Sequence, residues 1–137
     1  MSYRTFFGLA KEPFSADLEL DAILTTTELL GVHERLEYGV RLGAIALVTG
    51  EVGAGKSTAL RWSCGQLHPS RFKILWITAS AGSILEIYRQ LLAELDINTA
   101  SSSRAVLTRL IRAQITNLVT TKKQQPIMII DEASLLR

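Results

Sequence analysis

The amino-acid sequence predicts an α/β fold built on a parallel sheet. Short apolar runs of strand length, at residues 44–49, 73–78 and 126–131, alternate with amphipathic segments long enough to be helices. Parallel strands need crossover connections of about a dozen residues or more, usually helices, and these cover the faces of the sheet. We therefore expect a three-layer sandwich of helices, sheet and helices.

Composition indicates one globular domain over residues 1–137, since 47% of the residues are apolar. The net charge of +2 is small and the basic residues are spread along the chain, so bulk charge gives little reason to expect nonspecific nucleic-acid binding. The single cysteine, Cys64, cannot form an internal disulfide. It indicates a reducing compartment and a small buried side chain.

Residues 1–27 have no sustained periodicity but are rich in aromatic side chains, which predicts an ordered segment that packs on the rest of the chain. These aromatic residues are Tyr3, Phe6, Phe7 and Phe14. Arg4 and Gly8 interrupt the apolar start, so it does not have the pattern of a signal peptide. With no apolar stretch of about 18 residues either, we expect a cytoplasmic chain without a membrane segment.

The first predicted helix spans residues 28–40, where apolar residues recur at spacings of three and four. His33 is interpreted as a solvated helix histidine, because it has no second metal ligand at a suitable spacing. Residues 44–49 follow as a buried parallel strand, rich in β-branched residues and bounded by Gly43 and Gly50.

The middle of the chain predicts a helix, a strand and a second helix. Residues 56–66 form the first helix, which ends before Pro69, and residues 73–78 form the strand. Ser83, with Glu86 three residues later, resembles a capping box at the start of a helix over residues 84–95. A polar turn at residues 98–103 follows.

The last predicted helix, residues 104–120, is amphipathic and basic on its other surfaces. Its basic residues and those just after it are Arg104, Arg109, Arg112, Lys122 and Lys123. We interpret them as a solvated face, with a nucleic-acid contact as the alternative. The final strand, residues 126–131, ends in two carboxylates.

A glycine-rich turn between the first strand and its helix matches the phosphate-binding pattern G-x-x-x-x-G-K-S/T. Its glycines allow main-chain N–H groups to surround phosphate oxygens, and the helix start adds partial positive charge. Lys56 would bind the β- and γ-phosphates, Ser57 would ligate Mg²⁺, and Thr58 would bond near the α-phosphate. The predicted nucleotide-binding residues of this loop are Gly50, Glu51, Val52, Gly53, Ala54, Gly55, Lys56, Ser57 and Thr58.

The second predicted chemical group is the acidic pair Asp131 and Glu132. The apolar strand delivers both to the carboxyl edge of the sheet, where ligands bind in α/β folds. Asp131 would hold Mg²⁺ directly or through water, and Glu132 would deprotonate the water that attacks the γ-phosphate. With Lys56, Glu132 completes the predicted catalytic residues and favours hydrolysis over transfer to a metabolite.

Beyond these motifs, the chain resembles the amino-terminal part of ExeA-type (general secretion pathway protein A) AAA+ ATPases, which have the P-loop NTPase fold. The resemblance rests on the aromatic block from Tyr3 to Leu9, on Pro13 with Phe14, on residues 48–58 and on residues 129–133. The same core is similar to the ATPase helpers of transposons, which bind DNA and present a target site to a transposase.

The resemblance implies ATP and Mg²⁺ as cofactors and a homo-oligomer as the working state. It implies DNA or a transposase as partner in one case, and a protein of the secretion machinery in the other. It also implies that Phe14 lies beside the adenine, so that residues 1–27 cover the nucleotide site.

ATPases of this type continue past the Asp–Glu strand into a strand with a polar sensor residue, an arginine finger and a helical lid. We therefore expect residues 1–137 to be an AAA+ domain that is incomplete on its C-terminal side, without a central strand of the sheet. A gap in a sheet predicts a swapped or paired assembly, or a rearranged sheet. An arginine finger contributes about 10³–10⁵ in rate and a general base about 10²–10⁴, so slow or no hydrolysis is expected.

Three functions stay open at this point. The first is an ATP-driven switch in transposition or secretion, with transposition favoured because no membrane segment is seen. The second is a small-molecule kinase, against which Glu132 and the lack of a recognisable acceptor-binding lid argue. The third is a nucleotide-binding scaffold without turnover.

Overall fold

The structure is a computed structural model that describes residues 2–15, 17–79 and 83–136. The chain divides into two compact units, an N-terminal unit of residues 1–65 and a C-terminal unit of residues 66–137. No helix in the described ranges is long and apolar enough to cross a membrane.

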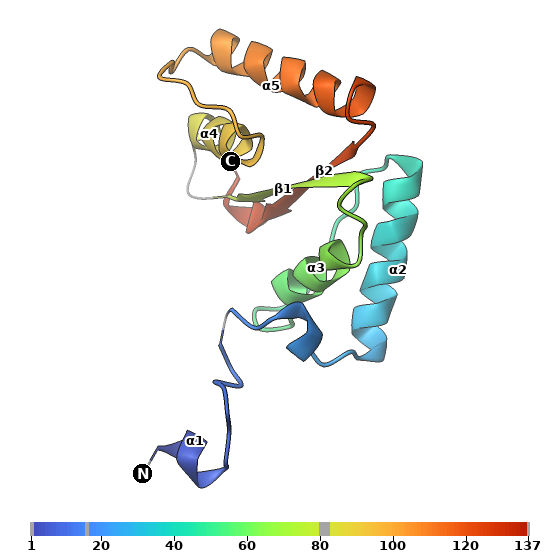
Figure 1. Cartoon of the computed structure of the whole chain (residues 1–137), viewed down its shortest axis with the longest axis vertical. Coiled ribbons are helices and arrows are strands. Elements are labelled where there is room, and N and C mark those ends of the chain that lie inside the picture. The colour runs from blue at the N-terminus through green and yellow to red at the C-terminus, as the bar shows by residue number, and fades with distance from the viewer. Residues whose placement is uncertain (1, 16, 80–82, 137) are drawn as a thin grey trace. The chain divides into compact units, whose positions relative to one another are not determined.

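The N-terminal unit is built from helices and irregular segments in its described residues (Figure 1). Its elements are α1 (Tyr3–Phe6), the 3₁₀ segment η1 (Leu20–Ala22), α2 (Thr27–Leu42) and α3 (Lys56–Gly65). α2 packs against α3, and η1 contacts α3.

α2 and α3 contribute the buried residues of this unit. The side-chain oxygen of Thr26 caps α2 by accepting a hydrogen bond from the N–H of Leu29 at 3.2 Å, which satisfies an amide that the first turn leaves without an intrahelical partner. Leu29 and Leu36 are buried on one face of α2, and Ala59 and Cys64 are buried on α3. Desolvation raises the pKa of the Cys64 thiol to about 11, so the predicted small buried side chain is confirmed.

His33 of α2 is not the solvated histidine that the sequence predicts. Its ring packs edge to face on Trp62 of α3, with ring centroids 5.5 Å apart, and its Nδ1 is buried with no hydrogen-bond partner among the described residues. The prediction was wrong because His33 lies four residues after Leu29 and three before Leu36, and both spacings place it on the apolar stripe.

The aromatic side chains of residues 1–27 are exposed. Phe6 and Phe14 are 71% and 87% exposed, and Phe6 contacts Phe7 edge to face. The packing expected of these aromatic residues is therefore not present in the structure. η1 contacts α3, where the end of the Leu20 side chain lies over Gly65, so a side chain at that position would require Leu20 to move.

Residues 44–49 do not form the strand that the sequence predicts. The segment is irregular, and its apolar side chains face solvent, with Ile45 at 103% and Leu47 at 81% exposure. A strand needs a neighbour that pairs with its main-chain N–H and C=O groups. Among the described residues, the sheet has two strands and neither pairs with this segment.

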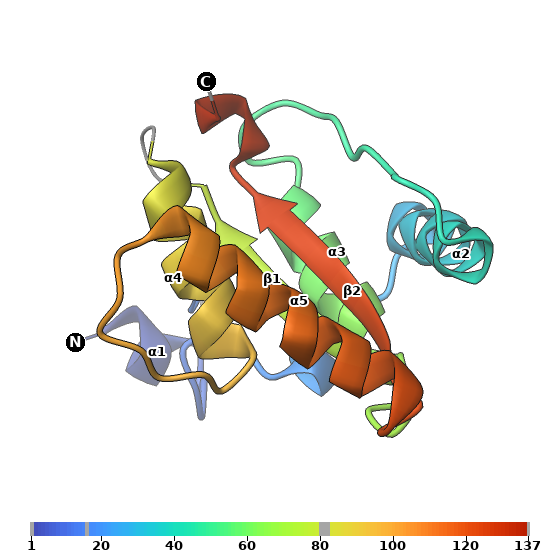
Figure 2. The same ribbon diagram turned by 90° about the horizontal axis from the view of Figure 1, so that it is seen from above.

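The C-terminal unit contains the sheet and its crossover helices. Its elements are β1 (Phe72–Thr78), α4 (Ile84–Glu94), α5 (Arg104–Thr120), β2 (Gln125–Asp131) and the 3₁₀ segment η2 (Ala133–Leu135). The two strands are parallel, with Phe72 opposite Gln125 and Thr78 opposite Asp131. α4 packs on β1, α5 packs on β2, and the two helices pack on each other, as Figure 2 shows.

Apolar side chains from β1, α4 and α5, together with Leu95 just after α4, form the core of the C-terminal unit. Its buried members are Leu75, Ile77, Leu91, Leu92, Leu95, Leu107, Ile111 and Leu118. Ile129 of β2 is also buried. The helix residues recur at spacings of three and four, as the sequence predicts for the faces of α4 and α5 that cover the sheet.

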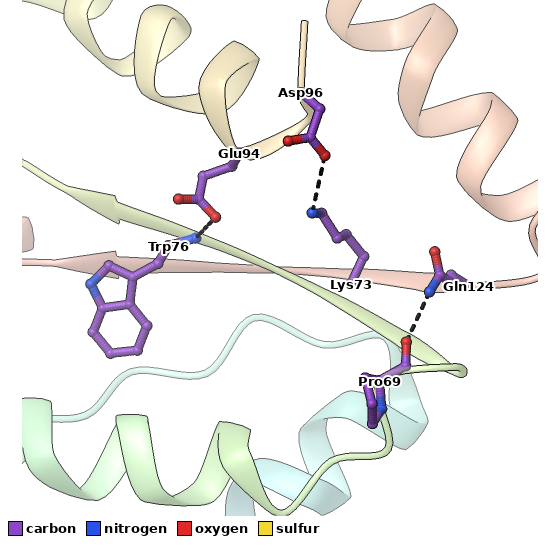
Figure 3. A network of polar contacts seen from close by, with 6 residues as sticks. All are labelled: Pro69, Lys73, Trp76, Glu94, Asp96 and Gln124. Carbon is purple, nitrogen blue, oxygen red and sulfur yellow. Dashed lines mark hydrogen bonds and ion pairs between the residues drawn. The ribbon is translucent and has the colours of Figure 1, made fainter. Parts of the chain in front are cut away.

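α4 covers the outer edge of β1 with two polar side chains one helical turn apart. The side-chain amide of Gln90 accepts a hydrogen bond from the N–H of Thr78 and donates one to its carbonyl oxygen, both at 2.9 Å. The Glu94 carboxylate accepts a hydrogen bond from the N–H of Trp76 at 3.4 Å (Figure 3). These contacts pair main-chain groups that an edge strand otherwise offers to another strand.

Two further contacts hold the ends of β1 and β2 in place. The Lys73 ammonium lies 3.8 Å from the carboxylate of Asp96, just after α4, and the side-chain amide of Gln124 donates to the carbonyl oxygen of Pro69 at 2.8 Å (Figure 3). The second contact joins the turn before β1 to the turn before β2, so it supports their parallel register.

The α/β fold class with a parallel sheet is confirmed. Helices at 28–40, 56–66, 84–95 and 104–120 and strands at 73–78 and 126–131 are present with small shifts at their ends. The predicted capping box is wrong: the Ser83 side chain makes no capping hydrogen bond, and its main-chain oxygen accepts from the N–H of Glu86 at 3.0 Å.

Candidate nucleotide-binding site

The glycine-rich loop of the N-terminal unit lies between the irregular segment 44–49 and α3. Gly53 and Gly55 have φ angles of 80° and 84°, in the region that side chains disfavour. An added Cβ atom at either position would meet nothing within 4 Å. Main-chain conformation therefore requires glycine here, and close packing does not. The N–H of Ala54 donates to the carbonyl oxygen of Glu51 at 3.2 Å and closes the turn between them.

Lys56 is the first residue of α3, as predicted, and its side chain folds back over the loop. The ammonium donates to the carbonyl oxygens of Gly50 at 2.9 Å and of Glu51 at 2.8 Å. Two neutral carbonyl dipoles therefore hold a full positive charge at the loop. Phosphate oxygens carry negative charge and form stronger hydrogen bonds with an ammonium than carbonyls do.

The first turn of α3 adds hydroxyl groups and partial positive charge. Ser57 is half-buried and Thr58 is exposed, and no acidic residue lies in this turn. The N–H of Ala59 donates to the carbonyl oxygen of Gly55 at 2.8 Å, so the helical hydrogen bonds start from the loop itself. An N-terminus of this kind attracts anions.

The remaining predicted nucleotide contacts lie in the same unit. Glu51 and Val52 are exposed, Val52 at 101%, which leaves the loop main chain accessible. Phe14 is exposed as well. Its place beside an adenine, and the cover formed by residues 1–27, stay predictions.

The acidic pair lies in the C-terminal unit at the carboxyl end of β2. Asp131 is the last residue of the strand, and its carbonyl oxygen accepts a hydrogen bond from the N–H of Ala79 at 2.9 Å. Its side-chain oxygen Oδ1 accepts from the N–H of Glu132 at 3.0 Å. The carboxylate is therefore oriented by the main chain of the next residue, which fixes it at this edge of the sheet.

Glu132 has an unusual main-chain conformation for its residue type. Its φ and ψ angles of 56° and 35° are left-handed, which costs about 1–2 kcal/mol in a residue with a side chain. The strand therefore ends abruptly, and η2 starts at Ala133. The side chain of Glu132 is exposed.

The structure thus groups the predicted residues into two sets, residues 50–58 in one unit and Asp131 with Glu132 in the other. Coordination of one Mg²⁺ by Ser57 and Asp131 stays a prediction. No group of three or more His, Cys, Asp or Glu side chains in the described part could hold a metal ion. Mg²⁺ usually binds one or two protein oxygens together with phosphate oxygens and water.

Sequence reasoning missed the main-chain partners of Lys56, the carbonyl oxygens of Gly50 and Glu51. No pattern of side chains could have revealed them, because every residue has a carbonyl group. The left-handed conformation of Glu132 had no signal either, since glutamate is rare in this region.

The fold and these motifs define an α/β P-loop NTPase. Comparison with known protein families matches residues 40–137 to the AAA domain family, and the chain belongs to that family. No curated protein matches the chain. No solved structure matches it either. Family membership makes it an AAA-type ATPase domain with nucleotide as ligand.

Proposed function

We propose that this protein is an ATP-dependent switch that binds MgATP at residues 50–58, hydrolyses it with the help of Glu132, and couples the two states to a partner. The observation that carries the proposal is the loop itself. Positive φ angles at Gly53 and Gly55 shape a turn that holds the Lys56 ammonium, at the start of a helix without acidic residues in its first turn.

Binding of ATP exchanges the partners of Lys56. The ammonium leaves the carbonyl oxygens of Gly50 and Glu51 for the β- and γ-phosphates. Charge-assisted hydrogen bonds to the phosphates replace the two hydrogen bonds that are lost. Main-chain N–H groups of the loop and of the α3 terminus surround the phosphates. The Thr58 hydroxyl would bond near the α-phosphate.

The oxygen donors fit Mg²⁺, a hard cation that prefers hydroxyl and carboxylate ligands. The Ser57 hydroxyl and the Asp131 carboxylate would hold it, and it would neutralise charge that develops on the phosphates. The main-chain N–H that orients Asp131 leaves its other carboxylate oxygen for this role. Glu132, next in the chain, accepts a proton from the attacking water.

The first test separates binding from turnover. At an ATP concentration 100 times the dissociation constant, the ligand should add about 2.7 kcal/mol to the free energy of unfolding. Lys56→Ala should abolish the ATP-dependent rise in melting temperature, and Lys122→Ala, which removes an exposed lysine after α5, should retain it. An unchanged rise in Lys56→Ala would contradict the site.

Glu132→Gln then tests the chemistry. The variant should still bind ATP but release phosphate about 10²–10⁴ times more slowly than the native chain in its active assembly, because it lacks a general base. Normal hydrolysis by Glu132→Gln would exclude Glu132 as the base. Phosphate transfer to a small metabolite at the native rate would instead favour the kinase alternative.

The resemblance to ExeA-type ATPases and to transposon helpers leaves two classes of partner. We propose the DNA-associated role, because the exposed basic face of α5 suits DNA. We also propose a homo-oligomer, since AAA domains often oligomerise and the apolar residues Ile45 and Leu47 are exposed. ATP-dependent retention of duplex DNA would support this role over secretion.

A further inference from the structure

The carboxyl ends of β1 and β2 meet at the last pair of the parallel ladder, where Thr78 lies opposite Asp131. One main-chain hydrogen bond closes the ladder beyond that pair, from the N–H of Ala79 to the carbonyl oxygen of Asp131 at 2.9 Å. Ala79 is buried, so this bond forms in surroundings of low dielectric constant, where it is stronger than in water. The position of Asp131 therefore depends on the peptide group that joins Thr78 to Ala79.

That peptide group is held from both sides. Its carbonyl oxygen, which belongs to Thr78, accepts a hydrogen bond from the side-chain amide of Gln90 at 2.9 Å. Its N–H, which belongs to Ala79, donates to Asp131. The Gln90 amide also accepts from the N–H of Thr78 at 2.9 Å, so two bonds hold it in place. Because a peptide group is planar and rigid, Gln90 fixes the direction in which the N–H of Ala79 points.

A second peptide group carries the contact on to the carboxylate. The carbonyl oxygen of Asp131 belongs to the peptide group between Asp131 and Glu132, and the N–H of that group donates to Oδ1 of Asp131 at 3.0 Å. The Gln90 amide, the two peptide groups and the carboxylate thus form one continuous series of hydrogen bonds. Each bond in such a series polarises the next and strengthens it. The left-handed main chain of Glu132 begins where this series ends.

The neighbouring contact of α4 does not lead to the acid. Glu94, one helical turn after Gln90, accepts a hydrogen bond from the N–H of Trp76 at 3.4 Å (Figure 3). Trp76 lies opposite Ile129, two residues before Asp131. An ionised carboxylate accepts hydrogen bonds and donates none. Both side chains cover the outer edge of β1, and of the two, Gln90 belongs to the series that ends at the carboxylate of Asp131.

We propose that Gln90 is a positioning residue for the acidic pair. Through two consecutive peptide groups it orients the carboxylate of Asp131 and the main chain of Glu132. The groups in the series all lie in the C-terminal unit. The inference rests on the proposed function, in which Asp131 holds Mg²⁺ and Glu132 accepts a proton. It adds to that function a residue of α4 that acts through β1.

The first test needs no nucleotide. In proton–nitrogen correlation spectra of the whole chain, Gln90→Ala should move the amide proton resonances of Ala79 and Glu132 upfield, because loss of the first donor weakens the later hydrogen bonds. In Gln90→Glu the carboxylate still accepts from the N–H of Thr78 but cannot donate to its carbonyl oxygen. The same two resonances should therefore move. A Glu132 resonance that stays in place in both variants would overturn the proposal.

Glu94→Ala is the matched control, because it removes a side-chain hydrogen bond to the same edge of β1. It should leave the resonances of Ala79 and Glu132 as they are in the native chain. Circular dichroism should show all three variants to be folded. If Glu94→Ala moves both resonances as far as Gln90→Ala does, a general loosening of α4 explains the effect and the proposal fails.

The second test measures the consequence for the metal. The affinity for a fluorescent ATP analogue is measured with Mg²⁺ and again with EDTA, and the ratio of the two gives the contribution of the metal. Gln90→Ala should reduce this ratio about threefold to tenfold, less than the loss of about 10–100-fold typical of a group bonded directly to a metal ligand. The affinity in EDTA should not change, because residues 50–58 bind the phosphates.

The two readouts separate the possible outcomes. A loss of affinity in both conditions indicates a structural defect, and together with an unchanged ratio it contradicts a role toward the metal. If the native chain binds the analogue no more tightly with Mg²⁺ than with EDTA, the metal role of Asp131 in the proposed function fails. The resonance of Glu132 then still decides whether Gln90 orients the acidic pair.

Discussion

Two apolar runs of similar composition have different fates in this molecule. Residues 44–49 and residues 125–131 are both rich in isoleucine, leucine or valine, and each leads directly into a predicted functional motif. The second run is strand β2, in register with β1 and with Ile129 buried. The first is irregular, with Ile45 fully exposed.

The difference shows that composition predicts the capacity for a strand, and a hydrogen-bonding partner decides its formation. β2 has β1 beside it and α5 packed on it. Residues 44–49 have neither a partner strand nor a covering helix for Ile45 and Leu47 among the described residues. An unpaired strand leaves its main-chain polar groups to water, and isolated strand pairs are at best marginal in water.

The largest expected effect contrasts equivalent side chains in the two runs. Ile129→Ala should lower the free energy of unfolding by about 2–5 kcal/mol, because it truncates a buried side chain. Ile45→Ala, at an exposed position, should change it by no more than about 0.5 kcal/mol. Urea denaturation measures both. Equal losses of unfolding free energy in the two variants would mean that residues 44–49 are packed in solution, which would contradict the contrast between the two runs.

A smaller effect is expected on self-association. Exposed apolar side chains without a strand partner favour contact between copies of the chain. Leu47→Lys should weaken association about tenfold, which corresponds to about 1.4 kcal/mol, as measured by sedimentation velocity over a range of concentrations. Leu24→Lys is the matched control, because Leu24 and Leu47 are both 81% exposed. Equal weakening by both would show that residues 44–49 have no special role.

The smallest expected effect concerns the outer edge of β1. Gln90→Ala removes both hydrogen bonds to Thr78 and should lower the free energy of unfolding by about 1 kcal/mol, since main-chain groups at this edge can bond to water instead. Gln114→Ala, at another half-buried glutamine of a helix, provides a comparison. Hydrogen exchange of the Thr78 amide should accelerate in Gln90→Ala, and an unchanged rate would show that the edge is protected by other means.

Most of the secondary structure was predictable because amphipathic periodicity is local. The start of α3 at Lys56 and the limits of α5 follow directly from the sequence. The strand at 44–49 was not predictable in the same way, because its formation depends on residues far away in the sequence. His33 was misjudged by an error of helix geometry, and the Ser83 side chain makes no capping hydrogen bond although its spacing to Glu86 fits a capping box.

The candidate site was predictable as a pattern but not as geometry. The residues 50–58 and the acidic pair were found from spacing alone, and the sequence placed both at the expected ends of helix and strand. The contacts of the Lys56 ammonium with loop carbonyls and the left-handed Glu132 involve main-chain conformation. Such conformations leave no trace in the order of side chains when the residue is not glycine.

The polar side chains that α4 places along β1 leave only the other edge of the sheet, beside β2, open to an additional strand. Because Gln90 and Glu94 already pair with main-chain groups on the outer edge of β1, an additional strand has to pair with β2. It would then lie next to the strand that ends in Asp131. Addition of that strand would therefore extend the sheet and enclose the acidic pair Asp131 and Glu132 at the same time, whether the strand comes from this chain or from another.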